Sequence, residues 1–410
     1  MATGSSPAIV SSRRTLKRPD FMYDFDRIIN RRGTNSYKWD ACPLKDVLPL
    51  WGADMDFAVA PCIQEALRRR VEHPVYGYVR VPDSYYNSII EWFARRHQFT
   101  MRREWIIYTI GVVPGISACI QALARPGDKV LVQTPVYNCF FSSILNSGCE
   151  IVDSPLCLHD GRYEMDFADL ERKASDPAVK LMLLCNPHNP AGRAWSREDL
   201  RNVADICLRH NVFIVCDEIH NELTFPGTKY TCLGTLGDEV LQHSAILTSP
   251  SKSFNIAGLQ IANITVANNE ARQRIDKAIN INEVCDVNPF GVEALQAAYS
   301  PEGEQWLKEL MEYIEGNYRF LREFFAKNLP RLSVVDMDST YLPWVDCSVL
   351  NKESEQIEKE LLEQQHVWFN AGQMYTKEPS SFIRINIACP RAFLQQALEK
   401  FRDYVRGLRA

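Results

Sequence analysis

The chain has 410 residues, of which 46% are hydrophobic and 24% charged, and Asp plus Glu (51) slightly outnumber Lys plus Arg (46). A chain of this length usually needs more than one hydrophobic core, so we expect two domains. The slightly acidic balance argues against nucleic acid as a partner, because nucleic-acid-binding proteins present a basic face. No apolar run approaches the ~20 residues that span a membrane, and we expect no membrane partner either.

Thirteen cysteines are scattered along the chain without the spacing of a zinc site. Most lie inside apolar runs, as buried thiols do. Free thiols in this number are typical of a reducing compartment, so we expect a cytoplasmic protein without a metal. The N-terminus has no signal-peptide core, and its basic residues before Asp20 fit either a short transit peptide or a disordered basic arm. We favour the arm.

Residues 1–45 show little periodicity and predict an extended N-terminal arm. From about residue 104 to 267, short apolar runs alternate with amphipathic stretches, a pattern typical of a parallel sheet with helices between its strands. The expected strands are residues 130–133, 150–154, 181–185, 212–216, 245–248 and 261–266. Residues 197–209 predict one of the helices, with Ser196 as its N-cap and Asp199 three residues on.

Residues 307–329 predict a long helix that leads into a C-terminal domain. We expect strands there at 333–337, 341–345 and 382–387, and helices at 354–365 and 390–406. The chain is therefore predicted to divide into an arm (1–45), a large domain (46–295) and a small C-terminal domain (296–410). The fold class is α/β.

Three polar residues directly follow strand runs: Asn186, Asp217 and Ser249. Ligands of open α/β sheets bind at the carboxyl ends of the strands, so these residues are expected on one rim. Lys252 follows shortly after Ser249. A lysine with an acid and an amide on the same rim indicates a pocket for pyridoxal 5′-phosphate (PLP), with Lys252 as covalent anchor and as the base that takes the substrate Cα proton. The alternative for Lys252 is a surface loop lysine.

The neighbouring residues each have a role in such a pocket and a plainer alternative. Asp217 would pair with the protonated pyridine nitrogen, or else cap a helix. Asn189, in a Pro- and Gly-rich turn, would donate to the cofactor phenolate oxygen and lie near the substrate. His220 would approach the same oxygen, or be a structural histidine. Tyr137 would stack on the ring as part of the catalytic site, or only pack there.

Two further features concern anions. The segment Gly-Val-Val-Pro-Gly at 111–115 opens an apolar helix, where the backbone N–H groups of Val112 and Val113 suit a phosphate. The Ser249 hydroxyl would serve the same phosphate. Arg384 lies between apolar residues of a strand and needs an anion. A substrate α-carboxylate and an intrachain salt bridge are both open at this point.

These segments together resemble a known family. The motifs are Trp-Gly-Ala-Asp-Met-Asp-Phe at 51–57, Tyr-Gly-Tyr at 76–78, Asn-Pro-His-Asn-Pro at 186–190, Cys-Asp-Glu-Ile-His at 216–220, the lysine segment 249–260 and the arginine segment 384–391. From about Phe21 onward, the chain resembles fold-type I PLP enzymes of the class I/II aminotransferase superfamily. Within it, the chain is most similar to the MalY/PatB family of cystathionine β-lyases (cysteine-S-conjugate β-lyases).

The resemblance implies a large domain with a mostly parallel seven-stranded sheet sandwiched by helices, plus a smaller α/β C-terminal domain. It implies a homodimer with the active site at the subunit interface, where Tyr78 reaches the cofactor phosphate of the other subunit. Residues 51–57 would line the substrate entrance and help hold the carboxylate, with Ala53 among the substrate-binding residues. Arg384 becomes the favoured clamp for the α-carboxylate of a small amino-acid substrate.

The reaction that the resemblance implies is β-elimination from L-cystathionine or a related L-cysteine S-conjugate. Gln260 stands where typical aminotransferases carry a phosphate-binding arginine, which favours a lyase over the alternative, an aminotransferase. Residues 370–379 lack the glycine-rich loop expected of the family, and Asp338 replaces a commoner Glu, so the substrate is the open question. Two further functions stay open, a lyase for a secondary-metabolite thioconjugate and a regulator that acts through a protein partner.

Overall fold

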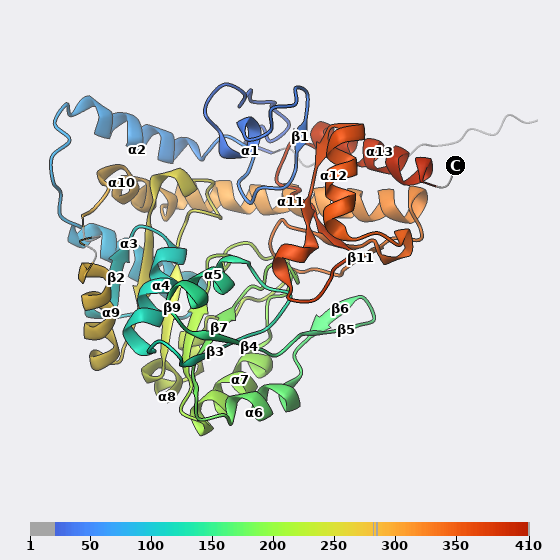
Figure 1. Ribbon diagram of the computed structural model, residues 1–410. Helices are drawn as coiled ribbons and strands as arrows, with labels where there is room; N and C mark the ends of the chain where they lie inside the picture. The colour runs from blue at the N-terminus through green and yellow to red at the C-terminus, as the bar shows by residue number, and fades with distance from the viewer. Residues whose placement is uncertain (1–20, 282, 284–285, 409–410) are drawn as a thin grey trace, which may run out of the picture.

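The computed structural model of the protein describes residues 21–281, 283 and 286–408. The basic arm predicted for residues 1–20 therefore lies outside the described residues. Figure 1 shows a broad body that contains the main sheet, with the C-terminal helices gathered at one side. The division into domains at residues 45 and 295 stays a prediction.

The main sheet has seven strands in the order β2-β10-β9-β8-β7-β3-β4. They are β2 (Ile106–Thr109), β3 (Lys129–Val132), β4 (Glu150–Asp153), β7 (Val179–Cys185), β8 (Phe213–Asp217), β9 (Ser244–Thr248) and β10 (Ala262–Thr265). Only β10 runs antiparallel to its neighbours, β2 and β9. The mostly parallel sheet and six of its strands are thus confirmed, and β2 is the strand that the sequence pattern did not single out.

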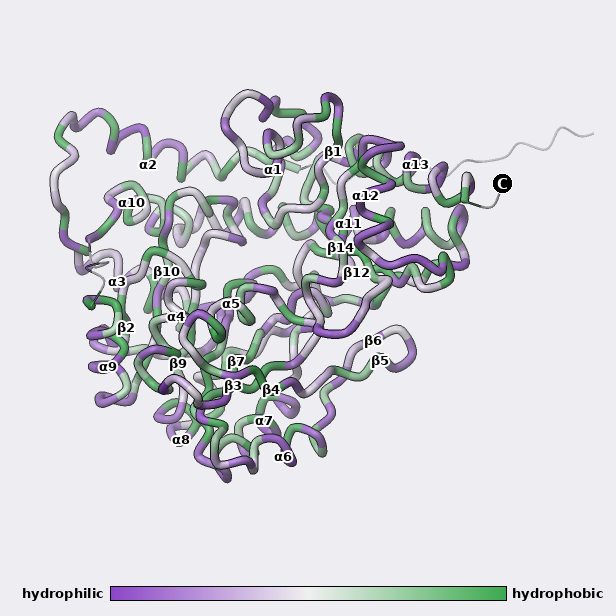
Figure 2. Tube along the Cα trace, in the orientation of Figure 1, coloured by the Kyte–Doolittle hydropathy of each residue, from purple (hydrophilic) through white to green (hydrophobic). Residues whose placement is uncertain are grey.

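Helices cover both faces of this sheet, as the side-chain alternation along β7 shows. Leu181 and Leu183 pack in one apolar cluster, and Met182 and Leu184 in another. The first cluster includes α4 (Val112–Leu123), α5 (Cys139–Asn146) and α9 (Asn269–Ile281), and the second includes α6 (Phe167–Ala174) and α7 (Arg197–Arg209). Because both faces are covered, the strands are continuous apolar runs, and Figure 2 shows them as hydrophobic stretches inside a more polar periphery.

The predicted helix at 197–209 is confirmed as α7, with the predicted cap. The Ser196 side chain accepts from the Asp199 backbone N–H, and the Asp199 side chain accepts from the Ser196 N–H. This reciprocal pair satisfies two N–H groups that would otherwise lack partners.

The C-terminal elements begin with α11 (Pro301–Asn328), which starts six residues before the predicted helix. The earlier start has a local cause, because Ser300 caps the Gly303 N–H and Pro301 occupies the first turn. An antiparallel sheet follows in the order β11 (Ser333–Val334), β12 (Trp344–Asp346), β15 (Phe382–Arg384) and β14 (Asn370–Ala371). Helix α12 (Ser354–Gln365) has the predicted bounds, and each end of α13 (Arg391–Gly407) lies one residue beyond the predicted end at 390–406. The strands predicted at 333–337, 341–345 and 382–387 correspond to β11, β12 and β15, which are shorter than predicted.

Residues from the start of the chain pair with a further C-terminal strand in a separate two-stranded sheet. Strand β1 (Leu48–Pro49) pairs in parallel with β13 (Val367–Trp368). The remaining elements are α1 (Tyr37–Asp40), α2 (Pro61–Glu72), α3 (Asp83–His97), α8 (Asp238–Gln242), α10 (Pro289–Ala298), the hairpin of β5 (Cys157–His159) and β6 (Arg162–Glu164), and five short 3-10 turns within the described residues.

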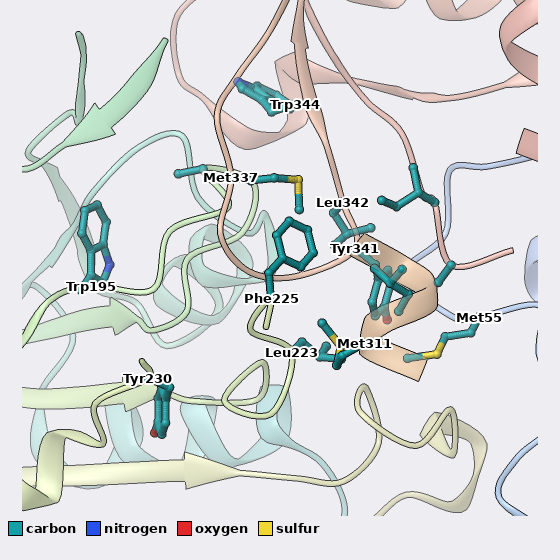
Figure 3. Close-up of a cluster of buried hydrophobic side chains, with 14 of the residues drawn as sticks. Met55, Trp195, Leu223, Phe225, Tyr230, Met311, Met337, Tyr341, Leu342 and Trp344 are labelled. Carbon is teal, nitrogen blue, oxygen red and sulfur yellow. The ribbon is translucent and has the colours of Figure 1, made fainter. Parts of the chain in front are cut away.

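One apolar cluster includes residues of the main sheet and residues of the C-terminal helices and strands. Figure 3 shows Leu223, Met311, Tyr341 and Met55 in this cluster, contributed by four separate segments. In the described residues, no helix combines the length and the apolar character needed to cross a bilayer.

Candidate active site

The rim expected from the sequence forms at adjacent parallel strands. Strand β7 ends at Cys185, β8 at Asp217 and β9 at Thr248, and the three strands are neighbours in the sheet. Asn186, Asp217 and Ser249 therefore lie at one edge, and Lys252 follows in the turn after Ser249.

Lys252 faces into this site rather than out to solvent. Its Nζ donates a hydrogen bond to the backbone carbonyl of Ala53, with an N–O distance of 2.9 Å. Burial lowers the pKa of the lysine, although the nearby Asp54 carboxylate opposes that shift. A lowered pKa favours the neutral amine that a nucleophile or a base requires.

Asp217 is a buried carboxylate without a cationic partner. Its side chain is 4% exposed, and its Oδ1 accepts from the Ile219 N–H at 3.0 Å. No Lys, Arg or His nitrogen of the described residues forms an ion pair with it, and burial raises its pKa to about 7. No helix begins at Asp217, so the alternative of a helix N-cap is wrong.

Arg384 presents the opposite case, a buried cation without a carboxylate. It is 3% exposed; Nη1 donates to Asn189 Oδ1 at 3.2 Å and Nη2 to the Trp51 carbonyl at 3.0 Å. Its Nε has no partner, and the guanidinium lies 4.8 Å from the centre of the Tyr375 ring. Among the described residues it makes no ion pair, so the intrachain salt bridge left open by the sequence is not observed.

His220 and Tyr137 are both neutral groups beside these charges. The His220 Nδ1 is buried without a partner, and burial, followed by the positive charges of Lys252 and Arg384, lowers its pKa to about 3. Tyr137 follows β3, is half-buried, and has a pKa raised by burial.

The groups predicted to bind the phosphate differ in whether their hydrogen-bond donors are free. Helix α4 begins at Val112, so the N–H groups of Val112 and Val113 lie in its first turn, where backbone donors have no partner within the helix. A Cβ on Gly115 would come within 2.8 Å of Leu247 Cδ2, so glycine lets this turn approach β9. The Ser249 hydroxyl, however, donates to the Ile261 carbonyl at 2.5 Å and would have to leave it to bind a phosphate.

Tyr78 and Gln260 lie away from the buried groups. Tyr78 is 94% exposed, on the segment between α2 and α3, and makes no hydrogen bond with the described residues. Gln260 is exposed and left-handed, with a φ of 51°. Within one chain, therefore, the structure does not bring Tyr78 to the site.

Sequence reasoning named residues 51–57 but missed that their backbone carbonyls accept hydrogen bonds from Lys252 and Arg384. Residues 51–57, which we call the strap, supply the carbonyls of Trp51 and Ala53. The Tyr341 hydroxyl also donates to the Ala53 carbonyl, at 2.9 Å. The strap was expected to line the substrate entrance, but a backbone acceptor leaves no trace in the residue type.

The two departures from the family pattern both lie against the site. The 370–379 segment contributes Tyr375, whose ring lies under Arg384 and whose hydroxyl accepts from Asn370. Asp338 accepts from the Ala194 N–H at 2.7 Å, just after the turn that carries Asn189. In that turn, Gly192 has a φ of 68° and a Cβ there would clash with Met337, so only glycine fits.

The residues present fit PLP, because Asp217 and Arg384 are buried and neither forms an ion pair with the described residues. Burying an unpaired charge is costly, so a carboxylate and a guanidinium kept apart indicate that ligands complete them. A protonated pyridine nitrogen would pair with Asp217, and a carboxylate would pair with Arg384. In the described residues, no group of three His, Cys, Asp or Glu side chains could hold a metal ion.

Comparisons with known proteins identify the family and find PLP-bound structures similar to this chain. The sequence pattern of the family described as aminotransferase class I and II matches residues 45–401. Cystathionine beta-lyase PatB of Bacillus subtilis is 38% identical over 92% of this chain and 99% of its own length. Protein MalY of Escherichia coli is 32% identical over 95% of this chain and 100% of its own length. The PLP-bound C-S lyase from Staphylococcus hominis superimposes with a TM-score of 0.87 at 31% identity, covering 93% of this chain and 99% of that one.

Proposed function

We propose that this chain, which belongs to the aminotransferase class I and II family together with PatB and MalY, is a PLP-dependent carbon–sulfur β-lyase. Its substrate would be L-cystathionine or a related L-cysteine S-conjugate, which with water gives a thiol, pyruvate and ammonia. The observation that carries the proposal is that Asp217 and Arg384 are buried without an ion-pair partner among the described residues, close to Lys252, whose pKa burial lowers.

Bound PLP supplies an attachment point for the substrate amine and an electron sink for the charge that develops at Cα. Lys252 would hold the cofactor covalently, and Asp217 would keep the ring nitrogen protonated. Asn189 and His220 would lie on the phenolate side, with Tyr137 against the ring. The first turn of α4 would bind the phosphate through the Val112 and Val113 N–H groups.

The chain's own groups then carry out the proton transfers. Arg384 would bind the substrate α-carboxylate through Nε and Nη, a bidentate geometry for which arginine is suited. Burial lowers the pKa of Lys252, which favours the neutral amine, and in that form Nζ would take the Cα proton. The thiolate then leaves from Cβ, and the proton held on Lys252 is available to it.

The choice of lyase over aminotransferase is supported by Gln260 and by the names of the relatives. A glutamine at this position leaves the phosphate with one positive charge fewer than an arginine would. The 370–379 segment lies against Arg384 and would influence which S-substituent is accepted.

A homodimer is part of the proposal, and its support is the exposed segment between α2 and α3. Tyr76 and Tyr78 are 56% and 94% exposed there, together with the apolar Val75. Large apolar side chains gathered on a surface are typical of an interface. We also propose a cytoplasmic location, supported by twelve cysteines that are all unpaired in the described residues.

The test is to measure pyruvate and free thiol released from L-cystathionine by the PLP-loaded protein, with and without an added 2-oxo acid. Equal amounts of thiol and pyruvate, independent of the 2-oxo acid, are expected. Amino transfer that requires the 2-oxo acid and releases no thiol would assign the protein to the aminotransferases instead.

A further inference from the structure

The strap contacts both cations of the candidate site. Lys252 Nζ donates to the Ala53 carbonyl at 2.9 Å, and Arg384 Nη2 donates to the Trp51 carbonyl at 3.0 Å. The Tyr341 hydroxyl gives the Ala53 carbonyl a second donor. The position of the strap backbone therefore sets where the lysine amine rests when it is not bound to the cofactor.

The strap has little secondary structure of its own, and side chains hold it in place. Asn255 Nδ2 donates to the carbonyls of Met55 and Phe57, and Asn386 Nδ2 to those of Gly52 and Asp54. Asn255 follows Lys252 in the chain, and Asn386 follows Arg384. The strap is thus tied to both of the segments that carry the cations.

The strongest contacts on the strap come from a third segment, residues 29–40, which we call the anchor segment. Arg31 bridges the Asp54 and Asp56 carboxylates and also donates to the Met55 carbonyl. Lys38 Nζ donates to Asp56 Oδ2 at 2.8 Å and to the Asp54 carbonyl at 3.1 Å.

This ion cluster is poorly explained by stability alone. Lys38 and Asp56 are each 3% exposed, and a buried ion pair often contributes no more stability than apolar residues of the same size. What charged groups in fixed geometry do provide is a defined position. Arg31 and Lys38 fix the position of residues 54–56. These residues directly follow Ala53, whose carbonyl accepts the hydrogen bond from Lys252.

We propose that Arg31 and Lys38 are positioning residues for the catalytic lysine. They hold the strap so that the Ala53 carbonyl keeps Lys252 Nζ in the site both before the cofactor attaches and whenever the substrate amine has displaced the lysine. A flexible lysine held at one point has fewer positions to search, which lowers the entropic cost of reaching the reacting carbon. The inference rests on the proposed function, since it concerns the same lysine and the same site.

The experiment compares Arg31→Met with Arg32→Met. Arg32 is the matched control because it lies in the same segment but donates to the Trp39 and Val47 carbonyls and not to the strap. Three quantities are measured for each: kcat and KM for thiol release, the thermal midpoint, and the rate at which the cofactor-free protein captures PLP on Lys252, by borohydride trapping and intact mass. The capture rate does not depend on which reaction the loaded enzyme catalyses.

Arg31→Met is expected to lower kcat and the capture rate by about tenfold or more, the scale of a lost hydrogen bond to a charged group. KM should change less than kcat, and Arg31→Lys should recover part of the loss. The thermal midpoint should fall further than in Arg32→Met, because Arg31 pairs with the buried Asp56 carboxylate, so the rates are compared at a temperature at which both variants are folded. Arg32→Met should keep both rates within roughly threefold of the wild type. Equal rates in Arg31→Met and the wild type, or equal losses in Arg31→Met and Arg32→Met, would overturn the proposal.

If Arg31→Met does not fold, Tyr341→Phe replaces it, because that change removes only a donor to the Ala53 carbonyl. Slower capture in Tyr341→Phe supports the proposal, and unchanged capture overturns it. A wild-type protein that releases no thiol from any S-conjugate would sink the proposed function, while the capture rates would still decide the role of Arg31.

Discussion

The residues proposed to surround the cofactor ring (the ring end) and those proposed to bind its phosphate (the phosphate end) differ in how exposed they are. At the ring end, Asp217, His220 and Asn189 are each no more than 4% exposed, and their positions are fixed by the sheet rim and its turns. Of the residues proposed for the phosphate end, Tyr78 is 94% exposed and Gln260 is also exposed. The difference fits the proposed dimer, in which one chain would supply the groups around the ring and a second chain would complete the phosphate end.

The largest expected effect comes from removing Lys252, the proposed covalent anchor, while both ends stay in place. Lys252→Ala should abolish the borohydride-stable cofactor adduct and lower turnover by at least about 10⁴-fold, because nucleophile and base are lost together. PLP should still bind without a covalent bond, since both ends are intact. Intact mass after reduction and pyruvate release measure the two outcomes; full activity in this variant would disprove the mechanism.

The next effect concerns the ring end alone. Asp217→Asn keeps the shape but leaves the ring nitrogen without its anion, so kcat/KM should fall by roughly 100- to 1,000-fold, the scale of breaking a buried ion pair. Thiol release across a range of cystathionine concentrations measures it. Activity within a few-fold of the wild type would show that Asp217 does not face the cofactor.

The same variant should stabilise the cofactor-free protein. The folded pKa of Asp217, about 7, lies above its ordinary 3.8, so the folded state retains a proton that the unfolded state has lost between these pH values. Stability of the cofactor-free wild type should therefore fall as the pH rises from about 4 to about 7, by up to roughly 4 kcal/mol. Asp217→Asn should lack this component, as urea unfolding at pH 5 and pH 8 would show.

A smaller effect tests the phosphate end. Tyr78→Phe should weaken PLP binding by about tenfold, the scale of one hydrogen bond to a charged group. The sharper measurement mixes Tyr78→Phe chains with Lys252→Ala chains. If Tyr78 serves the partner's site, a mixed dimer has one site with both groups, and tight covalent binding returns. No recovery in verified mixed dimers would place Tyr78 in its own chain's site or in none.

The smallest expected effect comes from adding a positive charge at Gln260, one of the residues proposed for the phosphate end. Gln260→Arg should tighten PLP binding by no more than about fivefold, because the position is exposed and charges there are screened. The products should still be thiol and pyruvate. A change to amino transfer would show that this one residue decides the reaction.

The ring end was predictable because its residues follow long apolar runs. A strand such as β7 is buried on both faces, so it stands out in the sequence, and the residue after it falls on the rim. Strand β2 was not singled out, although β4, which is equally short and lies at the opposite edge of the sheet, was. The family resemblance, rather than the pattern, supplied the seventh strand and the role of Tyr78.

The strap contacts were not predictable from the same kind of pattern. Ala53 and Lys252 are 199 residues apart, and Trp51 and Arg384 are 333 apart. The acceptors are backbone carbonyls, which every residue carries, so the residue type of one partner does not indicate the other. Arg31 and Lys38 precede an Asp-x-Asp motif, but opposite charges near one another in sequence are too common to indicate a buried cluster.

The pairing of β1 with β13 has a consequence for how the protein is made. Chains fold from the N-terminus as they leave the ribosome, yet Leu48 and Pro49 find their partner strand only at Val367 and Trp368. The strap that follows β1 likewise makes hydrogen bonds with Arg384 and Asn386, which are synthesised much later. The sheet can therefore assemble during translation, while the surroundings of the lysine are completed only after the last part of the chain has been synthesised.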